Sequence, residues 1–354
     1  MPRRSTATVL ALLLCGSPAY PCAPAPPRGV IVTILDETAL ILWDEATHTE
    51  HFIRGARFQS QASDFGFLVP TPSEPQLDQV RNDLFDRLEM SIQPSHVYGT
   101  RFGGVMPTAL VCLPYLMMSG GAKSSYDRAG ARPPVRVLQE RTVSGYDAVV
   151  LEADDAGALA AWLSERGYDN RPTLAAWLAP YVAAAYKITA FKVAKAGPDA
   201  AFATSAVRMS FHADRPFFPY REPTDQREDR TPRKLFVYFV GTGRVDGAVG
   251  AAPWPSKVLW SDRLAAPREI LEGALPEGTA LPEGAWLTAF EDASSPRPGD
   301  DDLFFAPAAN TQPYRPPPIV VETPWYVPIP LDVLALAILG VVLWRRRGKR
   351  KRAA

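Results

Sequence analysis

Two histidines separated by two residues, His48 and His51, are the first residues in the chain whose type and spacing could do chemistry. Imidazole nitrogens are common ligands of zinc and other transition metals. Apolar segments on either side of the polar turn from Asp44 to Thr47 predict a β-hairpin here. Positions three apart on a strand face opposite sides of a sheet, so the two rings could not share one ion without a bend. We therefore interpret both as polar hairpin residues and predict no metal site.

A glycine-rich segment and an acidic run could each bind an ionic ligand. Gly241-Thr242-Gly243 follows an apolar strand pattern, as phosphate-binding turns do, but such a turn needs a helix that begins there. Glycine and proline residues exclude a long helix, so we predict a plain glycine turn. Asp300–Asp302 could bind calcium, yet the spacing of an EF-hand is missing, and we favour a solvated acidic turn. The sequence predicts no cofactor.

Nucleophilic catalysis would need a serine or cysteine beside a base. The chain contains none of the motifs G-x-S-x-G, H-E-x-x-H and S-x-x-K. A triad can also be assembled from residues far apart in the sequence, because it is recognised by geometry rather than by order. His96 and His212 are the other histidines that could serve as its base. We predict no catalytic residue and lean toward a protein that is not an enzyme.

The cysteines could form a disulfide if the chain is exported. Cys22 and Cys112 follow the N-terminal segment that we expect to be removed, and in an oxidising space they could form a disulfide. Closing so long a loop would stabilise the fold by up to ~4–5 kcal/mol in the chain-entropy model. The alternatives stay open, since Cys22 lies near a chain end and Cys112 could simply be buried.

The first residues have the composition of an export signal. Residues 1–19 combine a basic start, a short apolar stretch and small residues before an expected cleavage after Ala19. A lipoprotein signal is the weaker alternative, because neither Cys15 nor Cys22 follows a small residue. We predict a cleaved signal peptide.

A second apolar segment lies near the other end. Val327–Trp344 would cover roughly 27 Å as a helix, close to the thickness of the hydrocarbon core of a bilayer. The basic tail 345–354 follows, which predicts a cytoplasmic C-terminus and an N-terminal domain outside. We predict a single-pass protein of the bacterial cytoplasmic membrane that contacts the lipid bilayer through this helix. Whether the helix is retained or processed stays open.

The charges are segregated along the chain. Lys and Arg equal Asp and Glu at 38 each, but nine of the basic residues lie in the two terminal segments. The remaining chain has 29 basic and 38 acidic residues, a formal charge of −9. An acidic surface does not neutralise phosphates, so we predict no nucleic-acid partner.

The region between the ends, residues 20–305, predicts one large α+β domain. β-Branched and aromatic runs indicate a mostly antiparallel β-sheet, and helical spacing of apolar residues indicates two or three short helices. One helix opens at Pro75. Another lies in residues 154–168, where Asp154 or Asp155 caps the start, and the next covers roughly Thr173–Ala184.

Two segments depart from this pattern. Residues 94–132 are rich in Gly, Ser and Pro, and predict an insertion in the domain. Residues 306–326 are rich in proline and predict an extended stalk before the C-terminal helix.

Three stretches of the chain, with their order and spacing, resemble the bacterial domain-of-unknown-function family 2330. They are Asp64–Pro72 (DFGFLVPTP), Gly145-Tyr146-Asp147 through Trp162-Leu163 to Gly167-Tyr168, and Phe211 to Pro219-Tyr220-Arg221. Members of that family are typically exported and often carry a C-terminal membrane helix, which the resemblance implies here. The family has no known catalytic residues to carry over. The single Cys112 in the insertion departs from relatives in which this segment is often cysteine-rich.

These observations favour a membrane-anchored, non-catalytic module outside the cytoplasm that binds or scaffolds a component of the bacterial envelope. The sequence does not identify that envelope partner. The alternative is an envelope hydrolase with a dispersed active site. It would need a deep pocket that gathers His96 or His212 with acids and a nucleophile.

Overall fold

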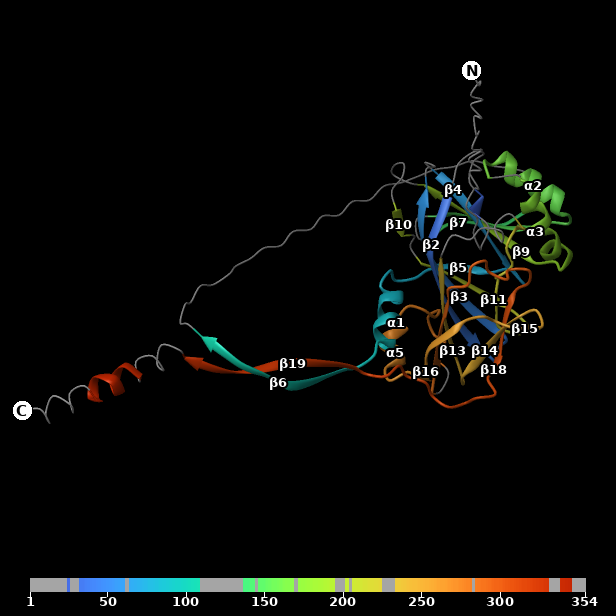
Figure 1. Cartoon of the computed structure of the whole chain (residues 1–354). Coiled ribbons are helices and arrows are strands. Elements are labelled where there is room, and N and C mark those ends of the chain that lie inside the picture. The colour runs from blue at the N-terminus through green and yellow to red at the C-terminus, as the bar shows by residue number, and fades with distance from the viewer. Residues whose placement is uncertain are drawn as a thin grey trace, which may run out of the picture. The chain divides into compact units, whose positions relative to one another are not determined.

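The computed structural model describes residues 24–25, 32–60, 64–108, 136–143, 146–168, 171–194, 201–203, 206–224, 233–281, 284–330 and 338–345. The chain divides into two compact units (Figure 1). The first comprises Met1–Gln93 and Pro133–Pro316, and the second comprises Pro94–Arg132 and Pro317–Ala354.

The largest sheet of the first unit has the strand order β16-β17-β13-β2-β3-β11-β5, with β10 beside β3. Neighbouring strands run antiparallel except β13 and β2, which are parallel. The strands are β2 (Val32–Asp44), β3 (Thr49–Ser60), β5 (Gln76–Gln79), β10 (Ala201–Ala203), β11 (Val207–His212), β13 (Lys234–Gly241), β16 (Lys257–Arg263) and β17 (Trp286–Asp292).

Two smaller antiparallel sheets complete the strands of this unit. One has the order β1-β4-β9-β8-β7 and the other the order β12-β18-β14-β15. The first contains β1 (Pro24–Ala25), β4 (Asp64–Thr71), β7 (Arg136–Val143), β8 (Tyr146–Glu152) and β9 (Lys187–Ala194). The second contains β12 (Phe217–Phe218), β14 (Val245–Val249), β15 (Ala252–Pro253) and β18 (Leu303–Pro307).

The helices are short: α1 (Leu84–Ile92), α2 (Ala156–Glu165), α3 (Pro172–Ala183) and α5 (Pro267–Ile270). The expected caps of α2 are confirmed. Asp155 accepts hydrogen bonds from the backbone N–H groups of Gly157 and Ala158, and Gly167 has a φ of +80°. The Tyr168 N–H then donates to the carbonyl of Leu163, which closes the helix.

Three apolar clusters hold the first unit together. One lies where the three sheets contribute buried side chains, such as Phe52, Phe191 and Phe305. Another covers the opposite face of the largest sheet, beneath α1 and the segment after β16. The remaining cluster joins α2 and α3 to the β4, β8 and β9 strands. Alternation along β2 explains the arrangement, because Ala39 and Ile41 face the first cluster while Leu40 and Leu42 face the second.

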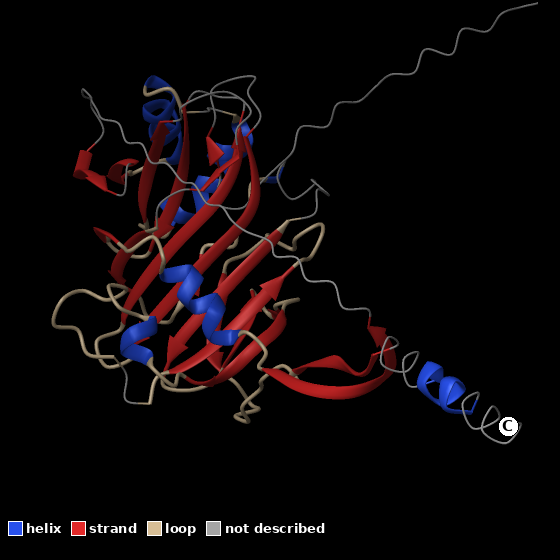
Figure 2. Ribbon diagram, turned by 90° about the vertical axis from the view of Figure 1, so that its left-hand side faces the viewer, coloured by secondary structure: helices blue, strands red, loops and turns tan. Residues whose placement is uncertain are grey.

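This architecture corrects the predicted α+β class, because the chain is mostly β-sheet in several sheets (Figure 2). The helix predicted to open at Pro75 is also wrong in its first part. Residues Gln76–Gln79 form β5, paired with β11, and the helix begins only at Leu84. Leu77 and Val80 fit the helical spacing of Leu84 and Leu88, but an available sheet edge recruits the first part as a strand. Tertiary pairing overrides such local periodicity.

The described part of the second unit is a two-stranded parallel ribbon, β6 (His96–Thr108) with β19 (Ile319–Pro330), together with helical residues 338–345. Among the described residues no helix has the length and apolar character needed to span a membrane. This finding overturns the predicted spanning helix over Val327–Trp344 and the single-pass membrane localisation based on it. Val327 lies in β19, because β-branched and aromatic residues also suit a paired strand. The predicted signal, residues 1–19, lies outside the described residues.

Candidate functional site

A pocket lies beside the turn that joins β2 to β3 in the first unit. Its volume is about 630 Å³, within the range typical of small-ligand sites. Its lining is predominantly apolar, and only a few polar side chains interrupt it. The apolar part includes Leu42, Trp43, Val240, Leu275 and Leu281, and the polar part includes Asp44, Glu45, His51 and Thr242.

Strand register explains why these residues meet. Side chains that pair directly across neighbouring strands project from the same face of a sheet. Leu42 pairs with His51 of β3 and with Val240 of β13, so one face of three strands presents all three side chains. The loop Leu275–Leu281, between α5 and β17, contributes further lining.

The turn at the pocket holds an ionised carboxylate in place. Asp44 Oδ1 accepts hydrogen bonds from the N–H groups of Ala46 (2.9 Å) and Thr47 (3.3 Å), and Oδ2 accepts one from Thr47 Oγ1 (2.7 Å). The hydrogen bond from the Thr47 side chain is the main cause that lowers the pKa of Asp44. Burial opposes it, and the two backbone donors lower the pKa further. Asp44 is therefore a fixed negative charge at neutral pH.

His51 is a neutral group in the pocket wall. Only 5% of the residue is exposed, and its Nδ1 lies 2.8 Å from Ser210 Oγ on β11. Burial lowers the pKa of His51 to about 4, helped by the positive charge of Arg208 and opposed by Asp44. Because a buried charge is costly, the ring stays unprotonated at neutral pH.

The residues singled out in the sequence are only partly brought together. His48 lies in the hairpin turn with a φ of 50°, exposed, with its ring edge-on to Trp43 at 5.9 Å, whereas His51 is in β3. Thr242 lines the pocket, and β14 rather than a helix follows it, which confirms an ordinary turn. Cys22 and Cys112 lie outside the described residues, so their disulfide stays a prediction.

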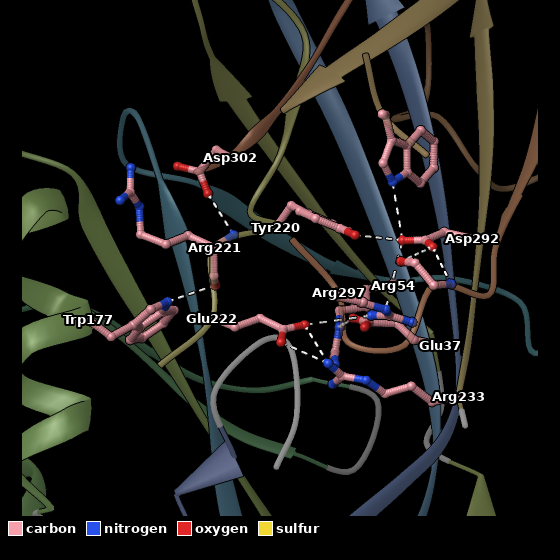
Figure 3. A network of polar contacts seen from close by, with 12 residues as sticks. Glu37, Arg54, Trp177, Tyr220, Arg221, Glu222, Arg233, Asp292, Arg297 and Asp302 are labelled. Atoms are coloured by element: carbon pink, nitrogen blue, oxygen red, sulfur yellow. Dashed lines mark hydrogen bonds and ion pairs between the residues drawn. The ribbon is translucent and has the colours of Figure 1, made fainter. Parts of the chain in front are cut away.

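The acidic run Asp300–Asp302 differs from the solvated turn that we expected. Asp302 is buried and accepts hydrogen bonds from Tyr181 Oη (2.6 Å) and the Arg221 N–H (3.2 Å). Asp301 pairs with Arg221 Nη2 at 2.6 Å. The run therefore ties the end of one sheet to α3 and to the Arg221 segment. Figure 3 shows the hydrogen bond between Asp302 and Arg221.

A buried network of charges was not found by sequence reasoning (Figure 3). Among the described residues it contains three arginines and three acids: Arg54, Arg233, Arg297, Glu37, Glu222 and Asp292. Both oxygens of Glu222 accept from Arg233 Nη2, at 2.8 and 2.7 Å, and Arg54 Nε lies 2.6 Å from Glu37 Oε1. All six of these described side chains are buried, and their charges balance, which fits a structural role.

The alternation of side chains along each strand could have revealed part of this network. Glu37 projects from the same face of β2 as the core residues Ala39 and Ile41, and Arg54 projects from the same face of β3 as Phe52. A charge at such a position must be paired or neutralised inside the core. The partners Glu222, Arg233 and Arg297 come from distant loops, so no spacing rule could predict them.

Glu50 projects from the same face of β3 as Phe52 but forms no ion pair with any described residue. It is fully buried, and its Oε2 accepts one hydrogen bond, from the Phe217 N–H at 2.9 Å. Burial raises the pKa of Glu50 well above its usual range. The stability that depends on its protonated form is therefore complete below about pH 4.5 and is lost as the pH rises through the folded-state pKa.

We expect Glu50→Gln to gain stability over the natural protein as the pH rises from 4.5 to 8, by more than about 1 kcal/mol at the upper end. The amide oxygen of glutamine can still accept the hydrogen bond from the Phe217 N–H, and the amide group does not ionise. Urea unfolding at several pH values measures the difference, with the exposed Glu89→Gln as a matched control. A Glu50→Gln difference that does not change with pH would contradict the buried charge.

Comparison with known proteins places the chain in context. A family model described as an uncharacterised protein conserved in bacteria, DUF2330, matches residues 19–297. No curated protein matches. A solved structure, the crystal structure of baculovirus P35, is similar at 7% sequence identity and a TM-score of 0.35, over 82% of this chain and 98% of that chain. A likeness with so low a TM-score does not indicate a shared fold or function.

Proposed function

The chain belongs to DUF2330, a family of uncharacterised proteins conserved in bacteria, and on the strength of its pocket we propose that it is a non-catalytic protein that binds a small, largely apolar ligand. The observation that carries this proposal is the pocket of about 630 Å³, apolar over most of its wall, with a few fixed polar groups. Ligand sites commonly combine these features, because apolar surface supplies affinity and polar groups set orientation.

The protonation state of His51 argues for binding rather than catalysis. A general base works best when its pKa is near the operating pH. The pKa of His51 is lowered to about 4, and the hydrogen bond to Ser210 uses Nδ1. Such a ring is a weak base but a good neutral hydrogen-bonding group.

The described residues do not bring together the groups that the alternative, a dispersed hydrolase site, would need. It required His96 or His212 within a deep pocket. Both side chains are exposed, and neither lines the pocket described above.

A variant that fills the pocket tests the proposal. Ala280 is exposed at the pocket wall, so Ala280→Trp should place an indole in the space that a ligand needs. Isothermal titration with hexylamine, 1-hexanol and hexanoate is expected to show saturable binding of at least one compound to the natural protein. The variant should weaken that binding at least about tenfold, the equivalent of 1.4 kcal/mol.

Ala251→Trp is the matched control, since Ala251 is also exposed but lies in the turn between β14 and β15, outside the pocket lining. It should leave binding unchanged. Failure of all three compounds to bind, or equal loss in both variants, would reject the pocket as a ligand site.

A further inference from the structure

The charged groups that line the pocket have one sign. Asp44 and Glu45 are its charged lining residues, and both are acidic. Among the ion pairs of the described residues, none includes either carboxylate. Glu45 has a single polar contact, with Thr242 Oγ1 at 3.5 Å from its Oε2. The pocket mouth therefore has negative charge that the described protein does not neutralise.

The Asp44 carboxylate has spare acceptor capacity. Its Oδ2 accepts one hydrogen bond, from Thr47, while each carboxylate oxygen can accept about two. The three bonds within the turn also fix its orientation before a ligand arrives. A fixed charge loses little conformational entropy when a ligand binds.

His51 supplies a neutral polar group beside these carboxylates. Only 5% of the residue is exposed, and it lines the pocket. Ser210 occupies Nδ1, and no described residue forms a hydrogen bond with the other ring nitrogen, Nε2. That nitrogen is not one of the buried atoms that lack a partner, so it is open to solvent in the pocket. A neutral ring whose Nδ1–H donates to Ser210 offers the lone pair of Nε2 to a donor from the pocket.

Arg208, whose positive charge acts on His51, has partners of its own. Its Nη2 pairs with Asp78 at 2.8 Å and its Nη1 donates to the carbonyl of Ala274 at 3.3 Å. Asp78 also pairs with the exposed Arg141 at 3.6 Å. Neither arginine lines the pocket, where the charged lining residues are Asp44 and Glu45.

Resting on the proposed function, we propose that the ligand is an amphipathic primary amine. Its ammonium group would lie at Asp44, Glu45 and His51, and its apolar part against Leu42 and Val240. A primary ammonium has three N–H donors, which match two carboxylates and one imidazole nitrogen. A carboxylate ligand would meet repulsion at the same place.

Titration of one chain length with different head groups tests this directly. At neutral pH and low salt, hexylamine should bind at least about tenfold more tightly than 1-hexanol or hexanoate, a difference of 1.4 kcal/mol. Hexyltrimethylammonium has the same charge but no N–H donor, and it should bind at least about threefold more weakly than hexylamine. Equal binding of the quaternary compound would overturn the primary-amine assignment.

Variants locate the head group. Asp44→Asn preserves the acceptor Oδ1 that the turn uses, and Glu45→Gln preserves shape, so the fold should be retained. Each should weaken hexylamine about three- to tenfold and 1-hexanol by a smaller factor. Glu277→Gln, exposed in the neighbouring loop but outside the lining, is the matched control.

The outcomes separate this inference from the proposed function. If 1-hexanol binds as well as hexylamine and Asp44→Asn changes neither, the amine is rejected while the apolar pocket stands. If calcium chloride alone binds at the same acids and displaces hexylamine, a cation site replaces the amine site. If no compound binds, the proposed function fails, and the amine assignment fails with it.

Discussion

Replacing Glu222 with alanine should lower the free energy of unfolding by about 3–5 kcal/mol. The Glu222 side chain is 0% exposed, and its carboxylate lies between two buried arginines, Arg233 at 2.7 Å and Arg297 at 3.9 Å. Burial raises the pKa of Glu222, while both arginines oppose that effect. Among the described residues of the network, removing this carboxylate leaves three buried guanidinium groups with two acids, an excess charge in an environment that solvates it poorly.

Chemical denaturation followed by tryptophan fluorescence measures this change. Glu272→Ala is a matched control, because Glu272 also pairs with an arginine, Arg81 at 3.0 Å, but its side chain is 63% exposed. Solvent screens such a pair, so this control should change stability little. A Glu222→Ala loss as small as that of Glu272→Ala would show that water reaches the network.

Gly66→Ala should destabilise the fold by about 1–3 kcal/mol. A Cβ at this position would lie 2.0 Å from Cε1 of Tyr168 and 3.1 Å from the carbonyl oxygen of Phe191. The Tyr168 ring is 8% exposed and packs in the cluster beneath α2 and α3, so it has little room to move. Adding one methyl group therefore forces the helix pair away from β4 or the ring out of its cluster.

A double-mutant cycle gives this prediction its sharpest test. In a Tyr168→Ala background, Gly66→Ala should lose most of its cost, because the clashing ring is absent. Gly243→Ala is the control, since nothing lies within 4 Å of the added Cβ there. Equal costs of Gly66→Ala with and without Tyr168 would contradict the packing explanation.

The close approach of Gly66 and Tyr168 also explains the stretches that resemble the family. Gly66 belongs to the first stretch and Tyr168 to the second. Tyr220, from the third, is 0% exposed and donates to Asp292 Oδ2 at 2.6 Å within the buried network (Figure 3). These family residues meet through packing and buried hydrogen bonds. These contacts give Gly66, Tyr168 and Tyr220 structural roles in the fold.

Local features were accessible from the sequence because each depends on residues within a few positions. The hairpin turn follows from Asp44, whose side chain bonds its own next residues, and the caps of α2 follow from Asp155 and Gly167 in the same way. The buried strand Leu235–Val240 was also predictable, since its uninterrupted apolar run places side chains in two clusters.

The tertiary structure alone decided which charges are buried and where the pocket lies. Glu222 and Arg233 lie near one another in the sequence, but Asp292 and Arg297 join them from about 60 to 75 positions away. His51 reaches the pocket because β3 lies between β2 and β11, and strand order is a long-range property. The apolar segment at Val327 formed a strand because a partner, β6, was available far away in the chain. Pairing, burial and desolvation depend on which distant residues meet, and local pattern does not encode that choice.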